Sequence, residues 1–374
     1  MSGAMGAADG EISALAAAGN LLSLTAAAAA AAADSGDMRM AADTRLQGRA
    51  LVGDIGGTNA RLALCHLEDG SLSEIEVHSA REAPRLQDCI RRFLDEHAAG
   101  VDYACLAVAC PVTSDQVQFT NCPWEFSIAR LQQELGLRRL IVINDFTAQS
   151  MSIPGMDPAA LVQVGGGQSV PGAPIAVYGA GTGLGVAHLI CHDGTWLPLP
   201  GEGGHMDLSP GSMLEDLVLI TLRARIGHVS AERVLSGPGL VNLYEAIAMR
   251  SGRLQEHLTP ADVTRQALEQ PGDGDCREAL MTFCTLMGRF GGNLALLMGT
   301  FGGVYITGGI VPRFLQFFEH SPFRQAFEDK GRFRGYLERI PTYVVTDTRA
   351  GLRGAGAMLR QELGAVLVQP AACP

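Results

Sequence analysis

Two glycine-rich segments, residues 53–59 and 179–185, combine the residue types that bind phosphate groups. Glycine has no Cβ, so the backbone N–H groups of such a turn can converge on an anion. A single glycine-rich turn is more often a plain β-hairpin. Two of them, with threonine hydroxyls as further donors, indicate one phosphate-rich ligand held from both sides. The candidate phosphate-binding residues are Gly53, Asp54, Ile55, Gly56, Gly57 and Thr58 in the first segment, and Gly181, Thr182 and Gly183 in the second.

The surroundings of the two segments repeat. Each glycine-rich segment lies between two apolar strands. The second of these strands is followed by an Asp-Gly turn and then by a third strand. The predicted strands are residues 50–52, 61–64 and 74–77 in the first copy, and 175–178, 186–189 and 196–199 in the second. An internal duplication outranks the interpretation of any single turn. Two copies of such a unit describe the actin and sugar-kinase architecture, with nucleotide in the cleft between the halves.

The scarcity of lysine narrows the class of nucleotide binder. Lys330 is the single lysine among 28 basic residues, and its surroundings match neither a P-loop nor the lysine-bearing strand of a protein kinase. The glycine spacing at residues 179–185 also misses the dinucleotide fingerprint. Phosphate must therefore be held by amides, hydroxyls and a metal ion, and Asp54 is the carboxylate placed to orient Mg²⁺ on it.

Polar residues stand where predicted buried strands end. Residues 105–109 and 140–143 are apolar runs, and the second leads directly into Asn144 and Asp145. Ligand chemistry in α/β sheets gathers at such strand ends, although Asp145 could also cap the next helix. The strand at residues 304–307 runs into Gly308 and Gly309, where bare backbone can approach a flat ligand or simply turn into a helix.

Two polar segments add candidate ligands for hydroxyl groups. Glu202 and His205 lie three residues apart in a glycine-rich loop, and Glu232 lies near a predicted helix start. Taken alone, Glu232 is a first-turn carboxylate favoured by the helix dipole, and His205 is a structural or metal-binding histidine. A zinc site needs further ligands, however, and no cysteine cluster follows His205.

Composition sets wider bounds. A chain of 374 residues predicts about two domains. The formal net charge of −11 argues against nucleic acid or an anionic membrane as the main partner. Nine cysteines without a C-x-x-C pair indicate free thiols in a reducing cytosol.

The first 44 residues differ from the rest of the chain. They are alanine-rich, with eight consecutive alanines from Ala26 to Ala33 and no basic residue before Arg39. The positive region of a secretory signal is therefore missing, and alanine is too weakly apolar to span a bilayer. We expect a disordered or loosely helical tail without a catalytic role; a true start at Met38 or Met40 is an equal alternative.

From Leu51 to about Gly364 the chain resembles bacterial glucokinase, the ATP-dependent, glucose-specific branch of the hexokinase and actin-like ATPase superfamily. Each motif alone is weak, but all of them occur in the family's order. The resemblance rests on residues 53–61, 143–148, 200–205, 230–239 and 302–313.

The resemblance implies a role for each candidate residue. Asp145 would be the general base that takes the proton from the sugar 6-hydroxyl. Asn144, Glu202, His205 and Glu232 would hydrogen-bond the other hydroxyls. The turns at residues 53–58 and around Thr182 would hold the phosphates of ATP, which binds with Mg²⁺ as a substrate complex, and Gly308-Gly309 would lie beside the adenosine. The implied reaction transfers the γ-phosphoryl group of ATP to D-glucose, the first step of glycolysis.

The resemblance also implies the architecture: an α/β, two-domain actin-like ATPase fold of the ribonuclease H-like type, with a duplicated βββαβα core and an interdomain cleft. A tail of residues 1–45 would precede a small domain of residues 46–155 and 346–366, and a large domain of residues 156–345. We further expect a cytoplasmic homodimer with no tightly bound metal, no nucleic-acid partner and no membrane partner.

Three alternatives remain open. A sugar-responsive transcription regulator would carry an N-terminal helix-turn-helix and a cysteine-rich zinc segment, which the sequence lacks. A filament-forming or chaperone-type ATPase would have no use for the loop at Glu202 and His205. Kinase activity on another hexose, such as mannose or an amino sugar, is the third.

Overall fold

The computed structural model describes residues 46–81, 83–97, 99–119, 124–253, 258–269 and 274–367. The chain from Leu46 onward forms one compact unit. The predicted N-terminal tail lies outside the described residues.

A first sheet has five strands in the order β3-β2-β1-β4-β7. The first three strands form antiparallel hairpins, and β4 and β7 then add in parallel to β1. The bounds are β1 Arg49–Ile55, β2 Asn59–His66, β3 Leu72–Ser79, β4 Tyr103–Val108 and β7 Arg139–Asn144.

A second sheet has six strands in the order β11-β10-β9-β12-β13-β8. Again the first three strands are antiparallel, β12 and β13 add in parallel to β9, and a short antiparallel strand closes the other edge. The bounds are β8 Leu161–Gln163, β9 Ile175–Ala180, β10 Leu184–His192, β11 Thr195–Gly201, β12 Gly303–Thr307 and β13 Thr342–Val345. A small separate hairpin joins β5 Gln116–Gln118 and β6 Glu125–Ser127.

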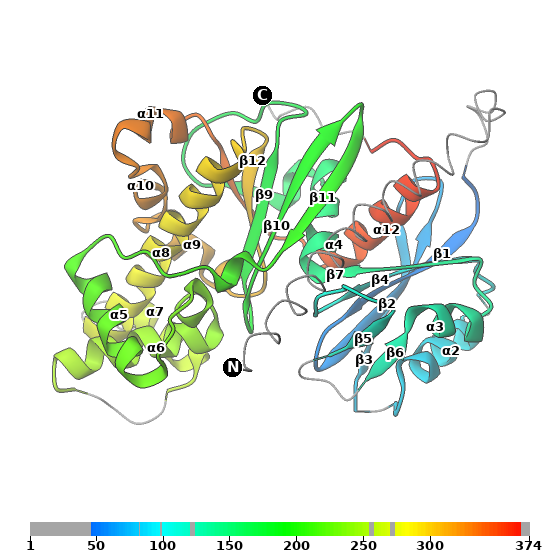
Figure 1. Cartoon of the computed structure of the whole chain (residues 1–374), viewed down its shortest axis with the longest axis horizontal. Coiled ribbons are helices and arrows are strands. Elements are labelled where there is room, and N and C mark those ends of the chain that lie inside the picture. The colour runs from blue at the N-terminus through cyan, green and yellow to red at the C-terminus, as the bar shows by residue number, and fades with distance from the viewer. Residues whose placement is uncertain are drawn as a thin grey trace, which may run out of the picture. The chain divides into compact units, whose positions relative to one another are not determined.

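Helices pack against both sheets and also lie between them (Figure 1). The α-helices are α2 Leu86–Glu96, α3 Ile128–Glu134, α4 Asp145–Ser152, α5 Met213–Ile226, α6 Gly237–Arg250, α7 Pro260–Glu269, α8 Gly274–Met298, α9 Leu315–Glu319, α10 Phe323–Glu328, α11 Arg334–Leu337 and α12 Ala350–Glu362. Short 3₁₀ helices are η1 Ile153–Gly155, η2 Pro158–Ala160, η3 Gly203–His205, η4 Ala231–Arg233, η5 Val311–Phe314 and η6 Gly331–Phe333.

The predicted strands are confirmed, and each observed end lies within three residues of the predicted one. Both predicted Asp-Gly turns join consecutive antiparallel strands, β2 to β3 and β10 to β11. Gly70 has a φ of 79°, and Asp193 and Gly194 have φ values of 48° and 77°. Glycine, aspartate and asparagine tolerate this left-handed region better than other residues, which explains the turn signal in the sequence.

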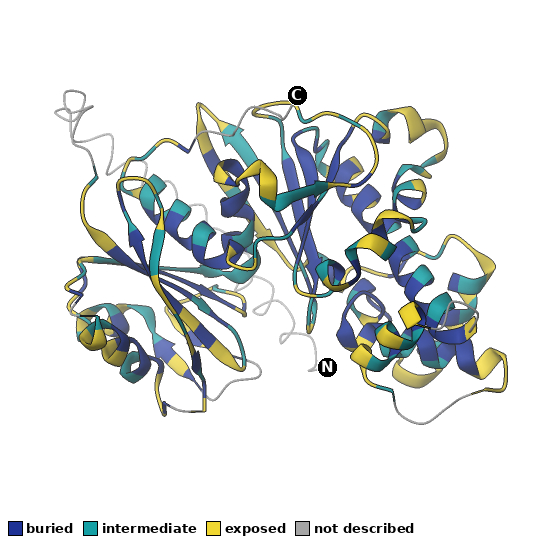
Figure 2. Ribbon diagram, turned by 180° about the vertical axis from the view of Figure 1, so that it is seen from behind, coloured by how far each residue is buried: buried dark blue, intermediate teal, exposed yellow. Residues whose placement is uncertain are grey.

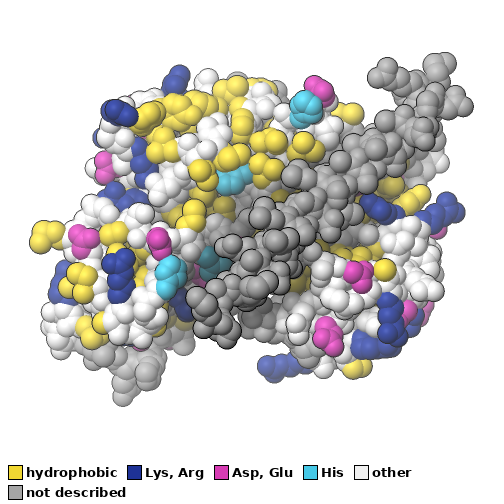
Figure 3. All heavy atoms as spheres, viewed as in Figure 1, with side chains coloured by type: hydrophobic (Ala, Val, Ile, Leu, Met, Phe, Trp, Pro, Cys, Tyr) yellow, Lys and Arg dark blue, Asp and Glu magenta, His cyan; other side chains and the backbone are white. Residues whose placement is uncertain are grey.

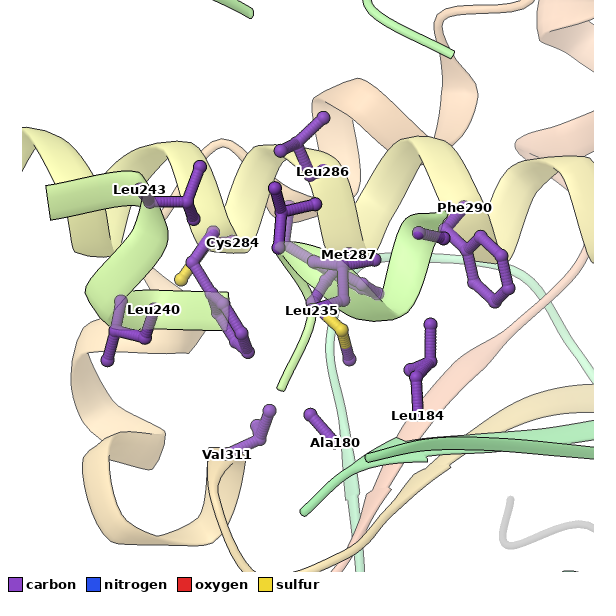
Figure 4. Close-up of a cluster of buried hydrophobic side chains, with 14 of the residues drawn as sticks. Ala180, Leu184, Leu235, Leu240, Leu243, Cys284, Leu286, Met287, Phe290 and Val311 are labelled. Carbon is purple, nitrogen blue, oxygen red and sulfur yellow. The ribbon is translucent and has the colours of Figure 1, made fainter. Parts of the chain in front are cut away.

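The central strands β9 and β12 of the second sheet are deeply buried (Figure 2). Every residue of β9 and of β12 is buried. Above the second sheet, α8 packs with α6 around Leu240, Leu243, Met287 and Phe290 (Figure 4). α8 is long and apolar enough to cross a membrane, but 67% of its apolar window is buried inside the protein, as expected of a core helix.

Two helices, α4 and α12, pack against each other between the two sheets (Figure 1). α12 also packs on β1 and β4, and α4 on β10 and β9. The approach is close: an ideal Cβ on Gly354 of α12 would lie 1.5 Å from the carbonyl oxygen of Ala148 in α4. A Cβ on Gly185 of β10 would lie 1.8 Å from the ring of Phe146 in α4. Glycine at these positions allows α4 to lie directly on both elements.

We predict that Gly354→Ala destabilises the fold. Alanine favours a helix over glycine by roughly 1 kcal/mol, but the new methyl group would overlap the backbone of α4, and such overpacking costs about 1–3 kcal/mol or more. Thermal unfolding should show a lower Tm. Gly335 is the matched control, because it is also helical and has nothing within 4 Å of an added Cβ. Gly335→Ala should keep or raise the Tm; equal effects of the two variants would refute the close packing.

Candidate functional site

The first glycine-rich segment forms the β1–β2 turn. Gly56 N–H donates to Asn59 O at 2.9 Å, and Ala80 N–H donates to Thr58 O at 2.9 Å, which ties the turn to the end of β3. Gly56, Gly57 and Thr58 are at least partly exposed at the tip, whereas Gly53 and Ile55 are buried in β1. A Cβ on Gly53 would lie 2.7 Å from the Leu106 side chain. Glycine at position 53 therefore serves strand packing, and the accessible backbone of the turn is at its tip.

Asp54 points out of the same strand beside Arg61 of β2. The Arg61 guanidinium Nη1 lies 3.6 Å from Asp54 Oδ2 and 3.3 Å from the carbonyl oxygen of Thr348, to which it donates. Burial raises the pKa of the Asp54 carboxyl, and Arg61 partly offsets the effect. An ideal Cβ on Gly351 would lie 2.9 Å from the Asp54 carboxyl carbon, so α12 also confines this side chain. Arg61 belongs to the motif of residues 53–61, but the sequence alone gives no sign of its contact with Asp54.

Asn144 and Asp145 sit where β7 passes into α4. Asn144 is the helix N-cap: its Oδ1 accepts from Phe146 N–H at 2.9 Å and from Thr147 N–H at 3.3 Å. Its Nδ2 donates to Cys110 O at 3.4 Å. The capping role that the sequence allowed for Asp145 thus belongs to Asn144, whose amide oxygen is engaged by the helix.

Asp145 is the first residue of α4 and its pKa is strongly perturbed. Burial, then the negative charges of Asp54 and Glu202, raise the pKa of this carboxyl to about 6, against the hydrogen bond from Phe146 N–H that lowers it. Such a pKa suits a group that accepts a proton near neutral pH. The charges of Asp54 in β1 and of Glu202 in the loop after β11 therefore both act on Asp145.

The second glycine-rich segment forms the β9–β10 turn at residues 181–183. Gly181 N–H donates to Gly183 O at 2.8 Å, and Gly237 N–H at the start of α6 donates to Gly181 O at 2.8 Å. An ideal Cβ on Gly308, whose φ is 85°, would lie 2.6 Å from Ala180 O. The Gly308 turn after β12 therefore lies against the strand end that leads into this turn.

The loop carrying Glu202 and His205 packs on the start of β10. A Cβ on Gly204 would lie 2.0 Å from Leu184 O, so only glycine fits there. After the loop, Ala231 N–H donates to Met206 O at 2.8 Å, and Leu208 N–H donates to Val229 O at 3.2 Å. These bonds join the Glu202–His205 loop to the segment that carries Glu232. Within the described ranges, His205 belongs to no group of three or more side chains that could hold a metal ion.

Glu232 lies in the first turn of a helix, as its sequence position allowed, but this helix is not α6. It lies in the one-turn helix η4, and α6 begins later, at Gly237. Its Oε2 instead accepts from Leu184 N–H at 2.9 Å. The structure thereby places this side chain against the second glycine-rich turn.

A cavity of about 370 Å³ adjoins the Gly308-Gly309 turn. It is mainly apolar, and its walls come from α6, α7 and η5, the last following directly on the turn. The sequence does not mark the wall residues as a site, because apolar wall positions resemble ordinary core positions in a sequence. The wall residues are Leu240, Pro260, Ala261, Thr264, Arg265, Leu268, Glu269, Ile310, Arg313 and Phe314.

Comparison with known proteins agrees with this arrangement. A family model described as glucokinase matches residues 51–362. The glucokinase of Yersinia enterocolitica is 58% identical over 318 residues, which are 85% of this chain and 98% of that protein.

Solved structures give the same result. The crystal structure of a glucokinase from an Antarctic psychrotroph has a TM-score of 0.78 and 36% identity, covering 84% of this chain and 99% of its own. A glucokinase of the ROK family from Streptomyces griseus, solved with glucose and AMPPNP, has a TM-score of 0.56 and 18% identity, covering 84% of this chain and 100% of its own; it supports the fold alone. With a family model over most of its length and a curated relative at this identity, the chain belongs to the glucokinase family.

Proposed function

We propose that this protein transfers the γ-phosphoryl group of ATP, bound with Mg²⁺, to the 6-hydroxyl of D-glucose, giving glucose 6-phosphate and ADP. The observation that carries the proposal is the position of Asp145. The chain belongs to the glucokinase family, and its Asp145 follows β7 directly as the first residue of α4. Burial and the charges of Asp54 and Glu202 raise the pKa of this carboxyl to about 6. The family model and the 58% identical relative, both named glucokinase, support phosphorylation of glucose by ATP here.

Asp145 is the general base in this mechanism. Its carboxylate accepts the proton of the 6-hydroxyl while that oxygen attacks the γ-phosphorus and ADP leaves. Phosphoryl transfer demands little covalent chemistry of the protein, which must position the reactants and neutralise charge. The nearby acidic charges keep the proton affinity of Asp145 high enough for it to act as a base.

The sugar is held by Asn144, Glu202, His205 and Glu232. Each hydroxyl of a sugar is both donor and acceptor, so carboxylate, imidazole and amide groups suit this task. Asn144 already accepts two backbone hydrogen bonds at its Oδ1 and donates one N–H of Nδ2 to Cys110 O, which leaves the second N–H of Nδ2 for the sugar. A site that hydrogen-bonds a particular hydroxyl strongly rejects analogues that lack it.

The nucleotide is held by both glycine-rich turns. Gly56, Gly57 and Thr58 face it from one sheet, and Gly181, Thr182 and Gly183 from the other. Asp54 orients the Mg²⁺ of the substrate complex, and Arg61 beside it contacts phosphate oxygens. The adenosine lies at Gly308-Gly309 with its base in the adjoining cavity, whose volume and apolar walls suit a flat heterocycle.

The architecture behind this site is a duplicated βββαβα core. The corresponding orders β3-β2-β1-β4-β7 and β11-β10-β9-β12-β13 support the duplication. Residues 46–155 with 346–366 form the small domain and residues 156–345 the large one. Domain closure brings ATP to the sugar and excludes water.

The protein acts as a cytoplasmic homodimer, in which the large domain supplies most contacts. Apolar side chains gather on part of the face in Figure 3, and exposed apolar residues of the predicted large domain include Met213, Ile220 and Leu297. Apolar surface of this kind favours association with a protein partner. The negative net charge disfavours nucleic acid and anionic membranes.

The activity itself is the first test. In a coupled assay with ATP and Mg²⁺, D-glucose should be phosphorylated much faster than ATP is hydrolysed without sugar, because the nucleophile is a bound hydroxyl. The same assay with mannose and glucosamine tests the alternative of another hexose. Equal ATP turnover with and without glucose would indicate an actin-like ATPase instead.

Asp145→Asn should lower kcat by roughly 10²–10⁴-fold, the usual contribution of a positioned base. The variant keeps the shape and the hydrogen bond to Phe146 N–H but removes the basicity. ADP affinity, measured by calorimetry, should change little, because the phosphate turns are separate from Asp145. More than about a tenth of wild-type kcat would exclude Asp145 as the base.

The pH profile follows from the raised pKa of Asp145. The ionised carboxylate is the active form, so kcat/KM should rise with pH, pass its midpoint near pH 6 and then level off. Glu202→Gln removes one charge that raises this pKa, so the remaining activity should have a lower midpoint. A midpoint that stays unchanged in that variant would assign the titration to another group.

A further inference from the structure

Glu232 lies against the backbone of the β9–β10 turn. Its Oε2 accepts a hydrogen bond from Leu184 N–H at 2.9 Å. An ideal Cβ on Gly183 would lie 2.5 Å from the same oxygen, so the carboxylate occupies the space that any other residue at position 183 would fill. A side chain expected to bind sugar is thus in direct contact with the turn expected to bind phosphate.

The segment around Glu232 holds the other end of that turn as well. Gly237 N–H donates to Gly181 O at 2.8 Å, and Ser236 Oγ donates to Glu232 O at 2.8 Å. Leu184 and Ala180, the residues on either side of the turn, place their side chains in the core beside α6 and α8 (Figure 4). The turn is therefore anchored at both ends, and Glu232 supplies one anchor.

The hydrogen bond from Leu184 N–H explains why Glu232 lies beside the phosphate turn better than its negative charge does. A carboxylate repels phosphate, so its negative charge beside a phosphate-binding turn is unfavourable for nucleotide affinity. A backbone N–H left without a partner in a partly buried site is also unfavourable, and an unfixed turn loses its preorganised donors. A carboxylate that accepts from Leu184 N–H leaves the N–H groups of Thr182 and Gly183 free for the ligand.

We propose that Glu232 is a positioning residue for the nucleotide: Oε2 fixes the phosphate turn through Leu184 N–H, while Oε1 remains available to the sugar. Both parts rest on the proposed function, which puts the nucleotide at this turn and the sugar beside Glu232. One side chain then links the two substrate sites, because any movement of its carboxylate at the sugar also moves the turn. Linkage of this kind is reciprocal between the two ligands.

The test compares Glu232→Gln with Glu232→Met, two uncharged side chains of similar shape. Glutamine keeps an oxygen that accepts from Leu184 N–H, and methionine does not. The dissociation constant of Mg²⁺-ADP is measured by calorimetry without any sugar. We expect Glu232→Gln to stay within about threefold of the wild type, and Glu232→Met to bind about five- to tenfold more weakly than Glu232→Gln, the usual effect of one hydrogen bond. Equal affinities in the two variants would overturn the proposal.

Glu202 provides the matched control. It is the other carboxylate of the site, and its charge acts on Asp145. Glu202→Gln and Glu202→Met should bind Mg²⁺-ADP equally well. A difference between them as large as the one at position 232 would show that any loss of a site carboxylate disturbs the turn, and would also overturn the proposal.

A second variant keeps the proposal testable if Glu232→Met fails to fold. Gly183→Ala pushes a methyl group toward Oε2 and should weaken Mg²⁺-ADP binding in the wild-type background. In a Glu232→Asp background the shorter side chain removes this contact, so the same substitution should weaken binding much less and the two effects should not add. Strict additivity would contradict the proposal. Because ADP binding without sugar is the readout, the proposal can fail while glucose is phosphorylated, and can hold if glucose is not the substrate.

Discussion

The close packing of α4 is the constraint on which the rest of the site depends. Its backbone lies on α12 at Gly354, and its Phe146 ring lies on β10 at Gly185, with no room for a side chain on the other element. Asp145 is the first residue of this helix, so its position is set by contacts to both sheets. A helix held this closely cannot shift without disturbing several elements, because protein interiors are densely packed.

Burial at this junction has an electrostatic consequence. Asp54 and Glu202 reach Asp145 from two different sheets, and burial together with their charges raises its pKa. Carboxylates gathered without cations nearby would be unfavourable for folding. Arg61 relieves part of this cost at Asp54, and the proposed Mg²⁺ of the substrate complex would act there too.

The glycines show why residue type alone does not identify a ligand contact. Gly53, Gly179 and Gly204 lack a side chain because neighbouring protein atoms fill the space: Leu106, Thr307 and Leu184 respectively. Gly56 and Gly181 meet no such obstacle closer than 3.5 Å, so their backbone is open. The sequence contains both kinds in the same short segments. Only the packing of other strands against the segments separates them.

The sequence by itself determined the strands, the turns between them and the repeated order of elements, because apolar runs and Asp-Gly turns depend on neighbouring residues. It also determined the family, through motifs such as residues 53–61 and 230–239. Tertiary structure decided the cap at Asn144 rather than Asp145, the contact of Glu232 with Leu184 N–H, and the cavity beside Gly309. The contact of Glu232 and the cavity join residues far apart in the chain, and distances and pKa shifts of this kind arise only when separate elements pack together.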